Sequence, residues 1–182
     1  MNSAFEEWEP YLKQWWNQYA SKTDVGKFLS PVSELFVAEF IKKKTGRNCI
    51  VVGQKTYDAV SPKQIFYPEV RLQIKLRTGT WHLETTRRVS KKNKDTSQSG
   101  HVAYRTNEFD ALAIFIPGDN FGVNKSCIRI IPTKELIDPK HPHQLVRNIS
   151  KKIRDKYDND EATDRVISEL YLNFNNEQPI LY

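Results

Sequence analysis

Cysteine is scarce in this chain, and its scarcity excludes a disulfide framework and a cysteine-rich zinc site. Only two cysteines occur among the 182 residues. Cys49 and Cys127 each lie within an apolar run, as reduced side chains of a core do. We therefore expect both thiols to be reduced and the protein to be cytoplasmic.

Long apolar segments are absent as well. The mean hydropathy is −0.64 and no run is long enough to cross a bilayer, so we expect no membrane partner. The first ten residues, MNSAFEEWEP, are acidic and aromatic, whereas a signal peptide begins with a basic segment followed by an apolar one.

Several catalytic signatures are also missing. The chain has seven glycines but no glycine-rich phosphate loop, which argues against nucleoside triphosphate chemistry. It carries no signature of a serine or cysteine nucleophile. The four histidines form no credible metal cluster, because His141 and His143 flank Pro142 in an expected loop without a cysteine or acid at ligand spacing.

The composition that remains is that of one folded domain spanning residues 1–182. Hydrophobic residues make up 38% and aromatic residues 12%, and no linker-like segment divides the chain. Apolar periodicity predicts an aromatic helix over residues 4–20. A second helix is expected to start with Ser30 as its cap and Pro31 in its first turn, and to end at Gly46.

Five segments have the pattern of strands, and the tail has two helical patterns. EVRLQIKLR alternates polar and apolar residues, and the turn RTGT predicts a hairpin that pairs it with TWHLETTRR. NCIVVGQ, FDALAIFIP and SCIRIIP read as further strands. HQLVRNISKKIRDKY and EATDRVISELYLNF read as the helices. The order predicts an α/β or α+β domain with a central sheet of about five strands flanked by helices.

Positive charge is concentrated in one stretch of the chain. The net charge is +6. The only acids in this stretch are Glu84 and Asp95. Binding to the phosphate backbone of a nucleic acid would require such a cluster of cations. Its cations are Arg71, Lys75, Arg77, Arg87, Arg88, Lys91, Lys92 and Lys94.

Four polar residues are expected to converge on one point. Gln73 and Lys75 share a face of one strand because side chains alternate with a period of two. Asp58 follows the preceding strand-like run, and Glu34 lies in the expected first turn of the second helix. Taken singly, each has a plainer reading: a solvent-facing strand for the pair, a turn for Asp58, and the helix dipole for Glu34.

Their order resembles the PD-(D/E)XK nuclease superfamily over residues of about 30–137. The motifs are SELFVAEF with Glu34, TYDAV with Asp58, RLQIK with Gln73 and Lys75, and the later strand NEFDALAIFIP. Tyr57 replaces the usual proline, and Gln73 replaces the second acid. Gln-x-Lys variants occur among restriction enzymes and among group I intron-encoded homing endonucleases, and the latter are the nearer likeness. The resemblance implies a restriction-endonuclease-like core, with the N-terminal aromatic helix and C-terminal helices as appendages.

The resemblance also implies a chemistry. Asp58, the side-chain oxygen of Gln73 and the main-chain carbonyl of Ile74 would hold one or two Mg²⁺ ions, for which Mn²⁺ could substitute. Glu34 would compensate for the charge that Gln73 lacks, directly or through a water. Lys75 would activate the attacking water.

The implied partner is duplex DNA, cut at a specific site by a homodimer or homotetramer. The expected DNA contacts are Arg77, Arg87, Arg88, Lys91, Lys92 and Lys94, mostly to phosphates. Tyr104 and Arg105 could also approach the substrate.

Alternatives stay open for both the site and the function. Glu69 could be an outer ligand and Glu84 could join the site, whereas Asp138-Pro139-Lys140 is set aside because it lies in an expected loop. A type II restriction enzyme is the alternative activity. A catalytically inactive DNA-binding protein of nuclease fold, or a basic module that binds an acidic protein, would be a non-enzyme.

Overall fold

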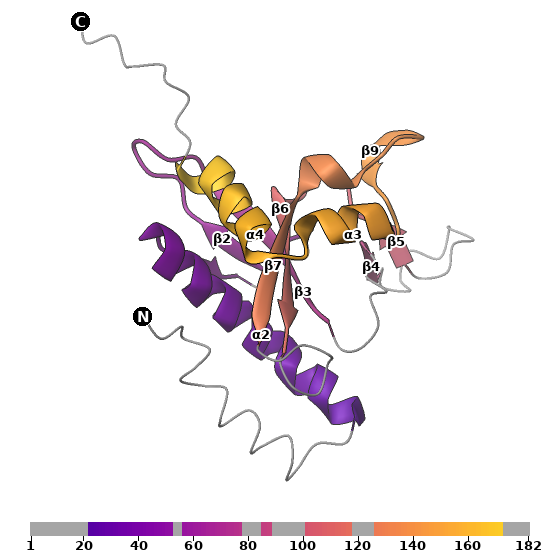
Figure 1. Ribbon diagram of the computed structural model, residues 1–182, viewed down its shortest axis with the longest axis horizontal. Helices are drawn as coiled ribbons and strands as arrows, with labels where there is room; N and C mark the ends of the chain where they lie inside the picture. Colours follow the sequence, from indigo (N-terminus) through magenta and orange to yellow (C-terminus); the bar gives the residue numbers. More distant parts are fainter. Residues whose placement is uncertain (1–21, 53–55, 78–84, 89–100, 118–125, 173–182) are drawn as a thin grey trace, which may run out of the picture.

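The structure, a computed structural model, describes residues 22–52, 56–77, 85–88, 101–117 and 126–172. Its centre is a mixed five-stranded sheet in the order β1-β2-β3-β6-β7 with flanking helices (Figure 1). The α/β class and the size of the sheet agree with the prediction. The aromatic helix expected over residues 4–20 lies outside the described residues.

Helix α2 (Lys22–Thr45) begins earlier than expected, which makes the predicted start at Ser30 wrong. Pro31 lies inside the helix, where it removes one main-chain hydrogen bond. The turn before it carries Leu29, which is buried in the core, and this burial favours continuing the helix through the proline. The predicted end is confirmed: Gly46 has a φ of 70° and its N–H donates to the Lys42 carbonyl at 2.8 Å.

The apolar stripe of α2 packs on the sheet as its spacing predicts. Phe36, Val37 and Ile41 are buried, and the Phe36 ring stacks on Phe115 with centroids 5.3 Å apart. Since Phe115 lies opposite Leu76 in the register, α2 covers the sheet face that carries the apolar side chains of β3.

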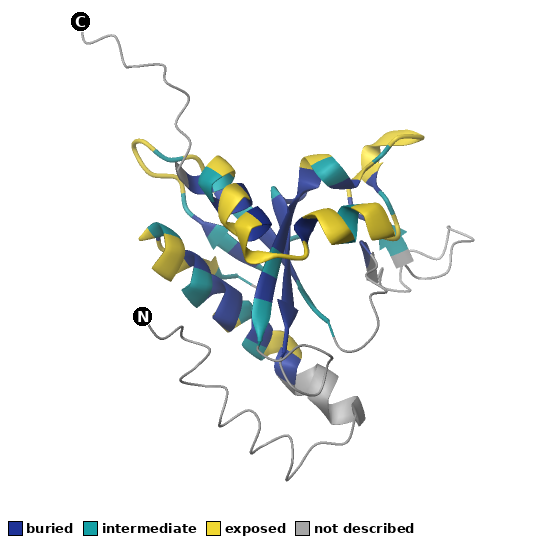
Figure 2. Cartoon of the chain, viewed as in Figure 1, coloured by how far each residue is buried: buried dark blue, intermediate teal, exposed yellow. Residues whose placement is uncertain are grey.

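Strands β3 (Val70–Leu76) and β6 (Ala111–Ile116) run parallel at the middle of the sheet. Every residue of β6 is buried, as in strands covered on both faces, and Figure 2 shows the central strands as the buried part of the molecule. Strand β2 (Ala59–Ser61) pairs antiparallel with β3, and β1 (Ile50–Val51) with β2. Strand β7 (Cys127–Pro132) closes the other edge beside β6.

The expected hairpin between residues 69–77 and 80–88 is wrong. Strand β4 (Thr86–Arg88) pairs with β5 (His101–Ala103) in a separate two-stranded sheet. Strand β3 instead has β2 on one edge and β6 on the other, because a central position buries its apolar residues more completely than a hairpin would.

The helix expected over residues 143–157 forms only in its second half, from Lys151 to Tyr157. Residues 143–145 belong instead to a ribbon of strands β8 (Ile137–Asp138) and β9 (His141–Leu145), which follows the short helix η1 (Thr133–Leu136). Main-chain hydrogen bonds of His143 and Leu145 to Thr106 and Tyr104 favour the extended form there.

Helices follow this ribbon to the end of the described chain. Ser150 caps α3 (Lys151–Tyr157), and Asn159 caps α4 (Asp160–Ile167), which continues as the π-helical turn η2 (Ser168–Leu172). Within the described ranges, no helix has both the length and the apolar character that a membrane crossing needs.

Candidate active site

Asp58 lies directly before β2, at the edge of β3. Its N–H donates to the Leu72 carbonyl oxygen at 2.9 Å, which extends the pairing of β2 with β3. Its Oδ2 atom accepts a hydrogen bond from the Ile74 N–H at 2.7 Å and another from the Gln73 side-chain amide. Both bonds end on Oδ2, and no described residue donates to Oδ1, so this oxygen retains its capacity to bind a ligand.

Gln73 is buried, with only 5% of its surface exposed. This burial rules out the plainer reading of a solvent-facing strand position. Its Nε2 atom, besides donating to Asp58, lies 3.5 Å from the Ile74 carbonyl oxygen. The amide therefore lies between the carboxylate and the main chain of β3.

The main chain of Ile74 faces the same point. Its N–H is directed at Asp58, and the N–H and C=O of a residue in an extended strand point toward the same edge. Both groups thus emerge on the edge of β3 that faces β2, beyond Leu72, where the pairing with β2 stops. The predicted role of this carbonyl as an oxygen ligand is compatible with its position.

Lys75 lies on the Gln73 face of β3, opposite the face that α2 covers. Its Nζ atom is 3.5 Å from the Tyr104 hydroxyl and 5.5 Å from the centre of that ring. Tyr104 is buried and packs edge-on against Phe109 at 5.2 Å, so it is a fixed contact for the ammonium group. Sequence reasoning mentioned Tyr104 only as a residue near the substrate; its contact with Lys75 depends on the fold.

Two carboxyl groups of the site have raised pKa values. Burial raises the pKa of Asp58, although the Ile74 N–H, the Lys75 charge and the Gln73 amide each act to lower it. Burial also raises the pKa of Glu34, and the negative charge of Asp58 adds to this shift. The structure therefore brings Glu34 within electrostatic reach of Asp58.

The early start of α2 changes the interpretation of Glu34. The helix begins at Lys22, so Glu34 is not in the first turn, and the prediction that placed it there is wrong. The helix dipole acts mainly within the terminal turns and cannot account for an acid at this position. The partial burial of Glu34 next to another acid is a cost that a cation would relieve.

The oxygen donors at this point fit a hard divalent cation such as Mg²⁺ or Mn²⁺. Asp58 and Glu34 supply carboxylates, and Gln73 and Ile74 supply neutral carbonyl oxygens. No cluster of three or more His, Cys, Asp or Glu residues suited to a metal occurs among the described residues, so the neutral oxygens would have to complete the site. The Gln73 amide turns its nitrogen toward Asp58, and holding a cation there requires it to present its oxygen instead.

Other acids considered from the sequence lie elsewhere or have other partners. Glu69 is half exposed and its carboxylate lies 3.9 Å from the Arg71 guanidinium, and Glu84 lies outside the described residues. Asp138 lies in β8 rather than in a loop, and it contacts His141 at 3.1 Å.

The ion pair of Arg71 with Asp110 was not predicted from the sequence. The Arg71 N–H and guanidinium group both donate to Asp110, which immediately precedes β6. This contact joins the start of β3 to the start of β6 and thereby supports the register that places Gln73 and Lys75. The available signal was an aspartate directly before a wholly apolar strand.

The predicted DNA contacts are only partly described. Arg77 is partly buried, and burial lowers its pKa, with Asp158 and Arg154 within electrostatic reach. Arg87 and Arg88 belong to β4, and the structure describes only their main chain. Lys91, Lys92 and Lys94 lie outside the described residues. Arg105 is exposed.

Comparison with models of known protein families, with curated proteins and with solved structures finds no match for this chain.

Proposed function

We propose that this protein is a Mg²⁺-dependent endodeoxyribonuclease of the PD-(D/E)XK type, which hydrolyses phosphodiester bonds at a specific site in duplex DNA as a homing endonuclease does. The observation that carries the proposal is the hydrogen-bonded contact of Asp58 with Gln73 and the Ile74 N–H, beside Lys75. Glu34, on α2, lies within electrostatic reach of Asp58.

Each residue has a role in this proposal. A bound Mg²⁺ would neutralise charge that develops on the phosphate oxygens and the leaving group. Asp58, the Gln73 amide oxygen and the Ile74 carbonyl would hold the cation, and Glu34 would assist directly or through a water. Lys75 orients the attacking water and stabilises its deprotonated form, and Tyr104 fixes the Lys75 ammonium group.

The proposal includes a homodimer or homotetramer that acts on DNA in the cytoplasm. One site cuts one strand, so cleavage of both strands requires two copies related by symmetry.

A second candidate is a nuclease-fold protein that binds duplex DNA without cutting it. The hydrogen bond from the Gln73 amide to Asp58 favours this candidate, because it occupies Oδ2 of the carboxylate without a cation.

Cleavage of a randomised duplex DNA library separates the two candidates. We expect discrete cuts in Mg²⁺ that disappear in EDTA and fall at least about a hundredfold in Lys75→Ala. Lys63→Ala is the matched control, since Lys63 is an exposed lysine in the connection between β2 and β3 at the end away from Asp58. Specific binding without cleavage in any divalent ion would support the second candidate, and the length of the sequence recognised around the cuts would distinguish homing from restriction.

A further inference from the structure

The ribbon of β8 and β9 presents polar side chains on a surface to which the proposed catalytic chemistry assigns no role. Four of the five residues of β9 are exposed, and only Leu145 is buried. An isolated two-stranded ribbon is marginally stable, so an exposed one needs anchors in the rest of the domain.

Main-chain hydrogen bonds provide these anchors along the edge of β9 that faces away from β8 and just after its end. The Leu145 N–H donates to the Tyr104 carbonyl at 2.8 Å, and the Thr106 N–H donates to the His143 carbonyl at 3.3 Å. The Thr85 N–H donates to the Arg147 carbonyl at 3.0 Å, just before β4. Strand β9 is therefore held between β8 and the segment that follows β5, and its side chains project from a fixed main chain.

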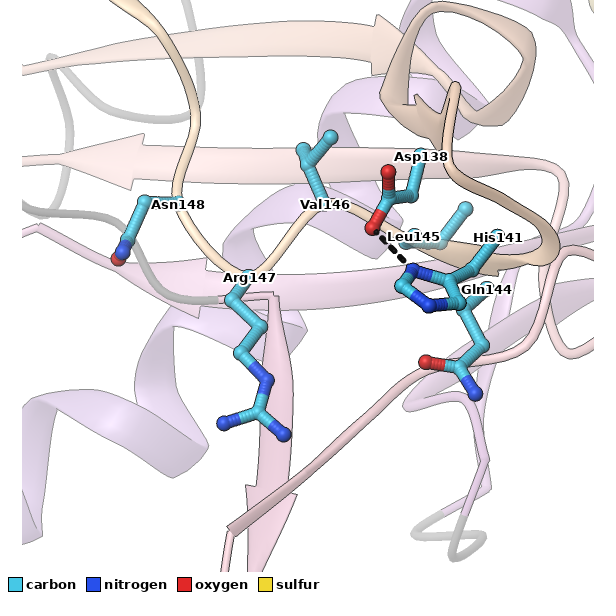
Figure 3. Close-up of a pocket in the computed structure, with 7 residues that line it drawn as sticks. All are labelled: Asp138, His141, Gln144, Leu145, Val146, Arg147 and Asn148. Carbon is cyan, nitrogen blue, oxygen red and sulfur yellow. Dashed lines mark hydrogen bonds and ion pairs between the residues drawn. The ribbon is translucent and has the colours of Figure 1, made fainter.

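The end of the ribbon borders a hollow lined by polar residues. Figure 3 shows Gln144 and Arg147 projecting to the same side, with Asn148 beside them. These three side chains are exposed and make no hydrogen bond to any described residue. His141 Nδ1 lies 3.1 Å from the Asp138 carboxylate. This contact orients the imidazole ring and leaves its Nε2 atom for a ligand.

Charge around the ribbon favours an anionic partner. Glu135 is paired with Lys156 at 3.0 Å, and Asp138 with His141. In contrast, no acid within the described ranges forms an ion pair with the exposed cations of this region. These cations are Lys140, Arg147, Lys151 and Lys152.

The ribbon is close to the candidate active site. Tyr104 accepts the main-chain hydrogen bond from Leu145 in β9, and the hydroxyl of the same tyrosine lies 3.5 Å from Lys75 Nζ. Adjacent strands are about 4.8 Å apart, so β9 lies one strand beyond the residue that contacts the proposed catalytic lysine.

We propose that the β8–β9 ribbon enters the major groove of duplex DNA and that base edges are read by Gln144 of β9 and by Arg147, two residues beyond the strand, next to the phosphate that the active site cuts. The inference rests on the proposed function for its choice of duplex DNA. The major groove, about 12 Å wide, admits a two-stranded ribbon. Glutamine pairs in bidentate fashion with adenine, and arginine with guanine, whereas Lys140, Lys151 and Lys152 contact phosphates.

Binding selection without cleavage tests the ribbon independently of catalysis. The full-length protein and the double variant Gln144→Ala/Arg147→Ala are each used to select from a randomised duplex library in EDTA, and the bound DNA is sequenced. The control is Gln64→Ala/Arg165→Ala, which removes the same two residue types from exposed positions outside the ribbon. Thermal melts of all three proteins verify folding.

We expect the double variant to lose about tenfold or more of the base preference at a few positions of the motif, which lie within roughly half a helical turn of one another. The control should keep the wild-type motif. An unchanged motif in the double variant overturns the inference, even if its affinity falls uniformly. So does a wild-type protein that binds no DNA.

Cleavage of the selected DNA in Mg²⁺ then tests the proposed function separately. A wild-type protein that selects a motif but never cuts it refutes the nuclease and leaves the result for the ribbon standing. A protein that cuts its motif, with a double variant of unchanged preference, supports the nuclease and overturns the ribbon.

Discussion

Gln73 is the residue on which the interpretation of this site depends most. A buried amide needs partners, and here it finds them in Asp58 and near the Ile74 carbonyl. An ordinary second acid at this position would place a third carboxyl group near Asp58 and Glu34, whose pKa values are already raised. The amide contributes an oxygen without adding to this repulsion, at the cost of weaker attraction for a divalent cation.

Gln73→Glu tests this balance of charge and affinity. We expect the variant to be less stable than wild type at pH 7 without a divalent ion, because it buries a further negative charge. Mg²⁺ should then raise its melting temperature more than that of wild type, since tighter binding to the folded state stabilises it by mass action. Melting curves with and without Mg²⁺ measure both effects, and Gln64→Glu is the exposed control. Equal Mg²⁺ shifts in wild type and Gln73→Glu would contradict a cation at Gln73.

Asp58→Asn tests the raised pKa of Asp58. A carboxyl group whose pKa is raised in the folded state favours folding while it is protonated, and this contribution is lost as the pH rises from its ordinary value of 3.8 through the higher folded value. Asparagine still accepts from the Ile74 N–H but does not ionise. The free energy of unfolding of the variant, relative to that of wild type, should therefore increase as the pH rises from 4 to 7 in EDTA.

Unfolding by denaturant at both pH values measures this difference. The same variant should lose the stabilisation by Mg²⁺. This loss distinguishes an Asp58 that binds a metal ion from an Asp58 that is only destabilised by burial. A stability difference that is independent of pH would show that burial does not raise the pKa of Asp58.

At the scale of elements, α2 and β3 build the site together. Helix α2 covers one face of the sheet through Phe36 and carries Glu34 within electrostatic reach of Asp58. The end of this helix is determined locally by Gly46, whose positive φ suits glycine and strains a residue with a Cβ atom. A Cβ atom added there would meet nothing within 4 Å, so any cost of substitution comes from the main chain alone.

Gly46→Ala should lower the free energy of unfolding by about 1–2 kcal/mol. Gly46→Asn should lower it less, because asparagine tolerates the left-handed region better than alanine does. Urea unfolding of both variants measures the difference. Equal losses in the two variants would indicate a packing defect rather than main-chain strain.

At the scale of the whole molecule, the proposed double-strand cleavage needs more than one copy of the site. Mixed oligomers of wild-type and Lys75→Ala subunits, obtained by co-expression, should cut one strand and release nicked duplex. A gel that separates nicked from linear DNA reports the outcome, and Lys63→Ala serves as the partner subunit in the control. Mixed oligomers that still linearise DNA in one step would mean that a single copy cuts both strands.

The sequence by itself determined the features that arise from neighbouring residues. The apolar stripe around Phe36 and Ile41, the helix end at Gly46 and the strand character of β3, β6 and β7 all follow from local periodicity and main-chain preference. The grouping of Asp58 with Gln73 and Lys75 was also accessible, because alternation in β3 places two of these residues on one face.

Only the tertiary structure decided which strands pair and which polar groups are buried. Four features depend on segments far apart in the chain: the choice of β6 rather than residues 80–88 as the neighbour of β3, the burial of Gln73, the contact of Tyr104 with Lys75 and the extended form of β9. Local propensity does not encode such contacts, because strand pairing and burial are set by the free energy of packing the whole sheet.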